Sequence, residues 1–414
     1  MLILAGGVGS RLNILVKPRA KPAVPFAGIY RIIDFALSTV MNSGLNRVGV
    51  LTQYKPLSLM NHLGTGGAWD FIGRSRVVKI LPPSTGFRDS DWYGGTADAV
   101  RQNISFIKSN PSEEVIILSG DHIYQMNLVE MLDFHRRHKA DVTVSMMKVP
   151  IEEIHQFGTG ITDSSGRIVE WDEKPEKPRT NLASMGIYVF NTDYLLSLLA
   201  ENRKDVDFAI DLIPKAIARD NIFAYPFASY WRDVGTVQVY WQAHMDLLDE
   251  NSDIPCLESW GARPNIETDG MEADYTAAAF SNAAEVCSSL ISAGCTIEGT
   301  VIRSVLSPGV VVKPGAVVRD SIIFHDCTIE RNAVVDLAIL DKEVAIGSGA
   351  VVGEGGGRDI ANRMYPDHLN SGITLVGREA KLPAGMIVGR NCIISPWTLE
   401  DSLPTHHLED GETL

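Results

Sequence analysis

A glycine-rich loop close to the amino terminus is the first stretch whose residue types could do chemistry. An apolar run at 2–5 is followed by Gly-Gly-Val-Gly-Ser-Arg at 6–11. Glycines after a strand let backbone amides approach a ligand closely, most often a phosphate. The spacing excludes two common phosphate motifs, because Leu12 replaces the third glycine of a dinucleotide fingerprint and no P-loop lysine follows Gly9. The loop is therefore either a nucleotidyltransferase loop, with Arg11 over a leaving pyrophosphate, or an ordinary strand-to-helix turn.

The segment after this loop is basic, although the chain as a whole is acidic. Residues 1–33 contain Arg and Lys but no Asp or Glu, whereas the whole chain has a formal net charge of -14. Arg19 and Lys21 lie among prolines with no acidic residue nearby, so we expect them to face phosphates. A basic island on an acidic protein favours a small polyanion. The negative net charge of the whole chain argues against nucleic acid or an anionic membrane as a partner, because most of the surface would repel both.

Two aspartates are candidates for binding Mg²⁺. Asp121 follows the apolar run 115–118, and a carboxylate at the end of a buried strand is poorly explained by packing. Mg²⁺ is commonly bound by one or two carboxylates together with substrate phosphates. Asp233, in the sequence YWRDVGT, is the second candidate. It could equally cap the helix expected from Thr236 onward, or pair with Arg232.

Two further stretches have both a functional and a structural interpretation. WYGGTADAV at 92–100 is either a capped helix start with Trp92 in the core or a loop that packs on a base or sugar. EWDEKPEKP at 170–178 is a charge run of the kind that is usually solvated, and Lys174 is its one candidate for contacting an anion. His122 follows Asp121, but without a second His or Cys at ligand spacing we expect a structural role.

The elements that must position these residues alternate between strand and helix over the first ~245 residues. Several of the strands are continuous apolar runs, which is typical of strands buried on both faces. This predicts an α/β domain with a Rossmann-like, mostly parallel sheet, whose ligands lie at the carboxyl ends of the strands. The expected strands are 47–53, 114–121, 142–149 and 184–190, and the expected helices are 34–44 and 192–202.

From about residue 290 the apolar residues recur every six positions, and the pattern repeats after 17 residues. Such a hexapeptide period with Gly and Pro at the corners is typical of a three-sided, left-handed parallel β-helix, whose coils must stack to bury their apolar residues. The coils are Leu306, Val312 and Val318; Ile323, Ile329 and Val335; and Leu340, Ile346 and Val352. A shorter first coil is expected at Ile291, Ile297 and Ile302, and after an interruption at 353–372 the spacing resumes with Val376, Leu382 and Val388.

These patterns predict three regions: a catalytic domain at 1–248, a linker at 249–284 and a β-helix domain at 285–414. With 45% hydrophobic and 21% charged residues, the composition is ordinary for a globular enzyme. No apolar run reaches the roughly 18 residues of a membrane span, and we expect a cytoplasmic protein. The scattered cysteines are expected to be free thiols: Cys256, Cys287, Cys295, Cys327 and Cys392.

The motifs occur in the order found in a known family. LAGGVGSRL, RAKPAVPF, WYGGTADAV, SGDHIY, EKP, SMGIYVF and YWRDVGT appear between residue 2 and about 240, and the resemblance extends to about 376. In this the chain resembles the bacterial ADP-glucose pyrophosphorylases, or glucose-1-phosphate adenylyltransferases, of the sugar nucleotidyltransferases. A bifunctional uridyltransferase–acetyltransferase also joins such a domain to a β-helix, but its loop typically has alanine where Gly6 stands.

The resemblance implies a reaction of ATP with glucose 1-phosphate that yields ADP-glucose and pyrophosphate for glycogen or other α-glucan synthesis. It implies that Mg²⁺ is bound by Asp121 and Asp233 and that Arg11, Lys21 and Asp121 are catalytic. The implied nucleotide-binding residues are Gly6, Gly7, Gly9, Gln53 and Trp92. The implied glucose 1-phosphate residues are Tyr93, Gly158, Glu173, Lys174, Ser184 and Asp211.

The resemblance further implies a homotetramer, in which the β-helix domain serves subunit contacts and regulation. It also implies an anionic allosteric effector bound with the help of Arg19 and Arg31. Pro18 and Pro25 stand where enterobacterial-type members carry an effector-linked lysine and histidine, so the effector stays open. Two alternatives remain: a catalytically weak regulatory subunit of a heteromeric enzyme, or another sugar-1-phosphate nucleotidyltransferase. The metal carboxylates and the loop cations are all present, which favours an active enzyme.

Overall fold

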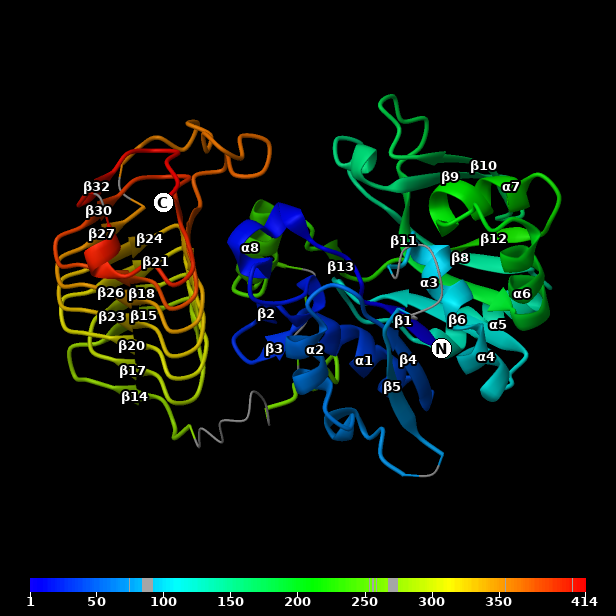
Figure 1. The fold of residues 1–414 in the computed structure, drawn as a ribbon, viewed down its shortest axis with the longest axis horizontal. Helices are drawn as coiled ribbons and strands as arrows, with labels where there is room; N and C mark the ends of the chain where they lie inside the picture. Colours follow the sequence, from blue (N-terminus) through cyan, green and yellow to red (C-terminus); the bar gives the residue numbers. More distant parts are fainter. Residues whose placement is uncertain are drawn as a thin grey trace. The chain divides into compact units, whose positions relative to one another are not determined.

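The computed structural model describes residues 1–73, 75–83, 92–252, 254, 257, 259–266, 275–353, 355–403 and 405–414 (Figure 1). The described chain packs as two compact units. Unit 1 comprises Met1–Gly7, Phe35–Pro56 and Leu63–Trp231, and unit 2 comprises Val8–Asp34, Leu57–His62 and Arg232–Leu414. The division follows packing and not chain order, so the boundaries at 248 and 284 stay predictions. Cys256 and parts of the expected linker lie outside the described residues.

Unit 1 is built on a nine-stranded mixed sheet in the order β10-β9-β11-β6-β1-β4-β5, with β8 beside β11 and β12 beside β8. Strands β6, β1, β4 and β5 are parallel neighbours, whereas β11 runs antiparallel to β6, β8 and β9. The strands are β1 (Leu2–Leu4), β4 (Arg47–Leu51), β5 (Val77–Leu81), β6 (Glu114–Ser119), β8 (Val142–Lys148), β9 (Gly158–Thr162), β10 (Ile168–Glu173), β11 (Leu182–Asn191) and β12 (Ile222–Phe227). A separate short strand is β7 (His122–Tyr124).

Helices connect these strands, and several pack directly on them, such as α3 on β1, α5 on β8 and α6 on β11. The core between them is apolar and includes Leu2, Val100, Ile117, Val144 and Phe190. The helices are α1 (Ile32–Asn42), α3 (Thr96–Gln102), α4 (Ile104–Ser109), α5 (Leu128–Arg137), α6 (Thr192–Glu201), α7 (Ile213–Ile217), the short η3 (Gly67–Trp69) and η4 (Ile154–Gln156), and the π-helical η5 (Phe208–Leu212). All predicted strands and both predicted helices are present, with ends shifted by a few residues.

Unit 2 begins within the glycine loop, at Val8, and the residues that follow the loop pack with α8. The ring of Phe26 lies 4.3 Å from that of His244 and also contacts Tyr240 edge-on. The backbone N–H of Ala27 donates to His244 Nε2, and the hydroxyl of Tyr240 donates to the Pro25 carbonyl. The elements are η1 (Ser10–Val16), η2 (Lys21–Ala23), β2 (Pro25–Phe26), β3 (Tyr30–Arg31), α2 (Pro56–Leu63), β13 (Trp231–Asp233) and α8 (Val237–Asp246).

The rest of unit 2 is the expected three-sided β-helix, drawn from yellow to red in Figure 1. One sheet contains β14 (Ala279–Phe280), β17 (Thr296–Ile297), β20 (Val311–Val312), β23 (Thr328–Ile329), β26 (Ala345–Ile346) and β29 (Lys381–Leu382). The second contains β15 (Glu285–Cys287), β18 (Thr300–Ile302), β21 (Val317–Arg319), β24 (Val334–Asp336), β27 (Val351–Val352), β30 (Ile387–Val388) and β32 (His407–Leu408). The third contains β16 (Leu290–Ile291), β19 (Val305–Leu306), β22 (Ile322–Ile323), β25 (Ala338–Leu340), β28 (Thr374–Val376) and β31 (Ile393–Ile394). The short η6 (Glu400–Ser402) precedes β32.

The register of the coils confirms the predicted apolar positions except one. Ile297, Val312, Ile329 and their equivalents are aligned in neighbouring coils and buried. The prediction for Ile302 is wrong: this side chain is 41% exposed, and its neighbour Val301 pairs with Val318 and is buried. The turn from Ile297 to Val301 is two residues shorter than the corresponding turn in the next coil, so the inward position comes earlier.

The described part of the chain contains no helix that is both long and apolar enough to cross a membrane. The four described cysteines are free thiols, of which Cys287 is exposed and the other three are buried in the β-helix.

Candidate functional site

Unit 1 has a cavity of about 290 Å³ at the carboxyl ends of β1, β4 and β6, where an α/β sheet is expected to bind its ligand. The parallel pairing of these three strands places their last residues, Leu4, Leu51 and Ser119, at one edge. The described lining residues are Leu4, Gly6, Gly7, Leu51, Gln53, Tyr93, Gly95, Thr96, Ala99, Ser119, Asp121 and Asp207. The structure thus brings together five predicted site residues: Gly6, Gly7, Gln53, Tyr93 and Asp121.

Asp121 follows β6 directly, as the sequence predicted. The hydroxyl of Ser119 donates a hydrogen bond of 2.5 Å to Asp121 Oδ1. The next residue, His122, accepts a hydrogen bond of 3.2 Å at Nδ1 from Trp231 Nε1, and the two rings meet edge-on. This contact agrees with the structural role expected for His122.

Gln53 and Tyr93 hold the loop before α3. The backbone N–H of Tyr93 donates to Gln53 Oε1, and the Tyr93 hydroxyl donates to the Leu81 carbonyl over 2.9 Å. Asn103 completes the arrangement by donating to the same hydroxyl. Trp92 is 56% exposed, which excludes its interpretation as a core residue and leaves its ring available to a ligand.

Three of the residues expected to contact glucose 1-phosphate lie on strands of the sheet. Gly158 and Glu173 are partners across β9 and β10, and Ser184 lies on β11. Burial raises the pKa of the Glu173 carboxyl, although the nearby Lys174 ammonium counteracts this. Lys174 extends into solvent, with Nζ 3.9 Å from Glu173 Oε1.

Asp207 and Thr96 line the cavity, and the sequence analysis missed them. Thr96 Oγ1 donates to Asp207 Oδ2 over 3.0 Å. The predicted sugar contact Asp211 instead accepts hydrogen bonds at Oδ2 from the backbone N–H groups of Val206 and Asp207. Its carboxylate therefore holds the turn that presents Asp207. No local motif marks Asp207, because the contact with Thr96 joins segments 111 residues apart.

In unit 2, Lys21 and Asp233 form an ion pair, with Lys21 Nζ 3.0 Å from Asp233 Oδ1. The Lys21 side chain is 5% exposed and that of Asp233 is 23% exposed. Gly9 is required nearby, because its φ of 65° is left-handed and a Cβ there would lie 2.8 Å from the Cβ of Lys21.

Arg11 lies over Gly235, two residues after Asp233. A Cβ at Gly235 would lie 2.8 Å from Arg11 Nη2, so a larger residue there would displace the tip of the Arg11 side chain. The helix after Asp233 is capped by Thr236, whose hydroxyl accepts from the Val239 N–H, and Arg232 pairs with Asp246. Thr236, and not Asp233, therefore caps this helix, and the ion-pair partner of Arg232 is Asp246.

Arg19 and Arg31 are both buried in unit 2. The guanidinium of Arg19 makes two hydrogen bonds to the carboxylate of Asp341, and Arg31 Nη1 donates to the carbonyl and the hydroxyl of Ser58. Any effector that bound Arg19 would have to replace Asp341. The geometry therefore does not favour the expected effector role of this residue.

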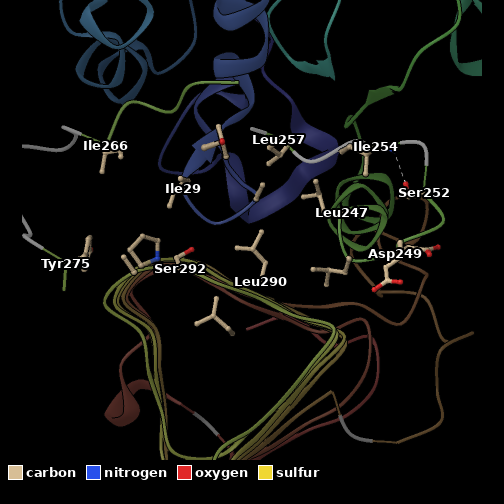
Figure 2. A pocket seen from close by; sticks show the side chains of 17 residues that line it. Ile29, Leu247, Asp249, Ser252, Ile254, Leu257, Ile266, Tyr275, Leu290 and Ser292 are labelled. Carbon is tan, nitrogen blue, oxygen red and sulfur yellow. Dashed lines mark hydrogen bonds between the residues drawn. The ribbon is translucent and has the colours of Figure 1, made fainter. Parts of the chain in front are cut away.

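Unit 2 also contains a larger cavity of about 1190 Å³, shown in Figure 2. Apolar side chains such as Ile29, Leu257 and Leu290 form much of its wall. Among its described lining residues the charged ones are Asp249 and Glu250, and these would repel an anion. This cavity therefore does not support the expected anionic effector.

Comparison with known proteins decides the family. Residues 1–250 match the family described as nucleotidyl transferase, and residues 272–376 match the GlmU-like, C-terminal hexapeptide family. Proteins named glucose-1-phosphate adenylyltransferase are similar over almost the full length. The one from Thermomicrobium roseum is 47% identical over 420 residues, with 100% of this chain and 97% of the relative covered. The one from Thermotoga sp. is 44% identical over 428 residues (99% and 97%), and the one from Acetivibrio thermocellus is 41% identical over 420 (100% and 96%).

The chain belongs to the glucose-1-phosphate adenylyltransferase family. This chain combines a nucleotidyltransferase domain with a hexapeptide domain, and the hexapeptide match is consistent with a left-handed β-helix. The resemblance expected from the ordered motifs is thereby confirmed.

Proposed function

We propose that this protein is a glucose-1-phosphate adenylyltransferase, which joins ATP and α-D-glucose 1-phosphate to ADP-glucose and pyrophosphate. The observation that carries the proposal is the similarity, over almost the whole chain, to relatives of that name. The chain also has the groups that adenylyl transfer requires. Unit 1 contains a cavity at the start of the glycine loop whose lining includes Asp121, and unit 2 contains Arg11, Lys21 and Asp233.

Nucleotidyltransferases of this kind generally use a divalent metal ion. We propose that the ion is Mg²⁺ and that Asp121 and Asp233 bind it, since carboxylate oxygens are its preferred protein ligands. The path of β13 supports this pairing. Trp231, at the start of this strand, contacts His122 beside Asp121, and Asp233 follows two residues later. When bound, the ion would neutralise charge on the phosphates and orient them.

The protein's own groups act by positioning and by charge in this mechanism. A phosphate oxygen of glucose 1-phosphate attacks the α-phosphorus of ATP in line, the bond to the β-phosphate oxygen breaks, and pyrophosphate leaves with the electron pair. No protein nucleophile is needed. The guanidinium of Arg11 and the ammonium of Lys21 stabilise the negative charge that develops on the leaving group.

The remaining residues hold the two substrates. Backbone amides of Gly6, Gly7 and Gly9 bind the ATP phosphates, and Gln53 and the exposed ring of Trp92 lie toward the adenine. The proposed glucose 1-phosphate residues are Tyr93, Gly158, Glu173, Lys174, Ser184 and Asp211, with Lys174 on the sugar phosphate and Asp211 acting through the turn at Asp207.

Assembly and regulation are further parts of the proposal. We expect a cytoplasmic homotetramer whose activity supplies glycogen synthesis and responds to an anionic effector. Arg19 and Arg31 are the proposed effector residues, and because Asp341 already binds the Arg19 guanidinium, an effector would have to displace Asp341 to reach Arg19.

A nucleotide panel tests the activity. Pyrophosphate release is measured with glucose 1-phosphate and, in turn, ATP, UTP, GTP and dTTP. We expect the highest kcat/KM with ATP, by at least about tenfold, because an adenine pocket is built to pair the polar groups of one base. Preference for UTP or dTTP would contradict the assignment of ATP as the substrate, but it would be compatible with the same in-line attack on the α-phosphorus of the nucleotide. No release with any nucleotide would instead favour a regulatory subunit.

A further inference from the structure

A buried ion pair connects the segment that contains Lys21 to the β-helix. Arg19 Nη2 lies 2.8 Å from Asp341 Oδ1, and Arg19 Nη1 lies 3.1 Å from Asp341 Oδ2. The side chain of Arg19 is 4% exposed and that of Asp341 is fully buried. The two residues are 322 positions apart in the chain.

Asp341 is a rigid anchor for this contact. It follows β25 directly, at a corner of the β-helix, and its backbone N–H donates to the Val376 carbonyl of the next coil over 2.9 Å. Its Oδ1 also accepts a 2.7 Å hydrogen bond from the Lys342 N–H. The position of the Asp341 carboxylate is therefore set by backbone hydrogen bonds within the β-helix, independently of the guanidinium of Arg19.

The backbone from Arg19 to Lys21 is short and is also held by hydrogen bonds. Ala20 precedes the single turn η2, which is closed by hydrogen bonds from Ala23 N–H to the Ala20 carbonyl and from Val24 N–H to the Lys21 carbonyl. Arg19 Nη1 also donates to the Leu15 carbonyl over 3.2 Å, which ties the preceding turn to the same point. Because Lys21 starts this turn, a displacement of Arg19 moves the backbone of Lys21.

Stability alone is a weak reason for such a pair. Burying two charges costs desolvation that their attraction often only offsets, and well-packed apolar residues can replace a buried pair without loss of stability. The planar guanidinium fork does, however, fix direction as well as distance. A lysine, by contrast, is a point charge on a flexible stem, and Lys21 must place its ammonium 3.0 Å from Asp233.

We propose that Arg19 and Asp341 are positioning residues for Lys21, so that the β-helix itself sets the place of this ammonium beside Asp233. Arg19 and Asp341 act through the backbone of residues 19–21 and do not touch the substrates. The inference rests on the proposed function of Lys21 and Asp233 in adenylyl transfer.

The test replaces the ion pair by an apolar pair of similar volume, Arg19→Met with Asp341→Leu, in the full-length protein. We expect the melting temperature to stay within about 5 °C of the wild type. We expect kcat for pyrophosphate release to fall by about 10-fold to 100-fold, with KM values for ATP and glucose 1-phosphate changed less than about threefold. Arg19→Lys, which keeps the charge but loses the fork, is expected to lose less of kcat than the double replacement. It is also the variant to measure if the apolar pair does not fold.

A double-mutant cycle shows whether the effect passes through Lys21. In a Lys21→Ala background, replacing the pair should lower kcat by less than about twofold, because the group being positioned is already gone. If the loss in that background equals the loss in the wild type, the pair does not act through Lys21 and the proposal is wrong.

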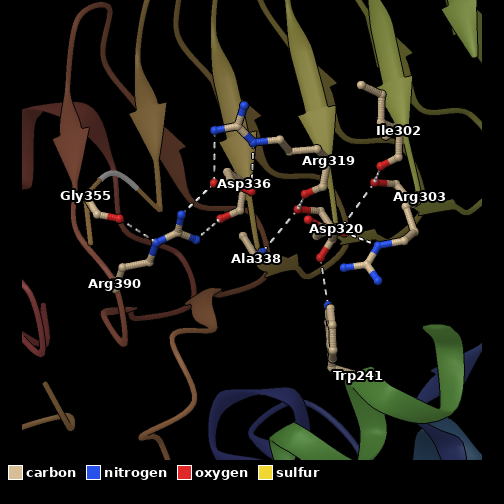
Figure 3. Close-up of polar contacts among 11 residues, drawn as sticks. Trp241, Ile302, Arg303, Arg319, Asp320, Asp336, Ala338, Gly355 and Arg390 are labelled. Atoms are coloured by element: carbon tan, nitrogen blue, oxygen red, sulfur yellow. Dashed lines mark hydrogen bonds and ion pairs between the residues drawn. The ribbon is translucent and has the colours of Figure 1, made fainter. Parts of the chain in front are cut away.

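A matched pair within the same unit is the control. Arg390 Nη2 and Asp336 Oδ2 lie 2.5 Å apart, and their side chains are 5% and 8% exposed (Figure 3). Asp336 also pairs with Arg319, so the control removes at least as many polar contacts as the test. Arg390→Met with Asp336→Leu is expected to leave kcat within about twofold of the wild type, whatever its effect on the melting temperature. An equal fall of kcat in the control would show a general effect of the β-helix and overturn the proposal, as would an unchanged kcat in the folded Arg19 and Asp341 variant. An inactive wild type would contradict the proposed function instead.

Discussion

His244 shows, at the scale of a single residue, how unit 2 holds a polar group in its interior. Its ring lies between Phe26 and Tyr240, and both of its nitrogens are bonded to backbone: Nδ1 donates to the Tyr240 carbonyl, and Nε2 accepts from the Ala27 N–H. This arrangement requires the neutral ring, because a second proton on Nε2 would face another N–H group. Burial lowers the pKa of His244 from 6.5 to about 4.

This lowered pKa predicts a loss of stability in acid. Between pH 6.5 and about 4 the unfolded chain binds a proton at this histidine that the folded protein does not bind, so stability falls as pH falls. Over the whole interval the His244 contribution amounts to roughly 3 kcal/mol, and above pH 6.5 it does not vary. Urea unfolding between pH 7 and 4.5 measures it, with His244→Gln as the non-titrating control. The same pH dependence in both proteins would contradict the assignment.

Some residues of the candidate site can be predicted from the neighbouring sequence, and others cannot. Asp121 and the glycine loop were predictable, because each sits beside an apolar run that marks a strand end. The contact of Arg19 with the β-helix and the position of Asp207 in the cavity could not be predicted in this way. Their partners, Asp341 and Thr96, lie 322 and 111 residues away in the chain, and no spacing in the sequence records such a contact.

At the scale of elements, α8 is fixed to the β-helix by one aromatic side chain. Trp241 Nε1 donates to the Asp320 carbonyl over 2.7 Å, and the guanidinium of Arg303 lies over the Trp241 ring, 5.8 Å from a ring centre (Figure 3). Arg303 also bonds to the Asp320 carboxylate. Because α8 starts just after Asp233, this contact limits the movement of the metal-binding candidate.

Substitutions at Trp241 measure this contact. We expect Trp241→Phe to lower the free energy of unfolding by about 1 kcal/mol, the value of one hydrogen bond, and Trp241→Ala to lower it by about 2–3 kcal/mol through lost packing. Urea denaturation is the measurement. Gln242→Ala, one position further on the same helix and exposed, should stay within about 0.5 kcal/mol. Equal effects of Trp241→Ala and Gln242→Ala would show that α8 is not held here.

The elements themselves were largely predictable because their signals are periodic. The hexapeptide period gives the coils of the β-helix, and only the short turn before Val301 shifted one inward position. The sheet of unit 1 was predicted as mostly parallel, but β11 is antiparallel to its neighbours. A buried apolar strand has the same composition in either direction, so its orientation does not appear in the sequence.

At the scale of the whole molecule, the residues that we propose to be catalytic are divided between the two compact units. Gln53, Tyr93 and Asp121 belong to unit 1, whereas Arg11, Lys21 and Asp233 belong to the unit that also contains the β-helix. The cations of residues 8–34 thus belong to the same compact unit as residues 232–414. This organisation gives the β-helix a physical connection, through Arg19 and α8, to groups that we propose to be catalytic.

Asp121→Asn tests the central claim, adenylyl transfer at a carboxylate-bound metal, most directly. The substitution keeps the shape of the side chain and the hydrogen bond partner Ser119 but removes the charge. We expect the rate of ADP-glucose formation from ATP and glucose 1-phosphate to fall by about 100-fold or more, with a melting temperature close to the wild type. Asp133→Asn, on the exposed face of α5, is the matched control and should keep full activity. A folded Asp121→Asn protein that turns over near the wild-type rate would contradict the account.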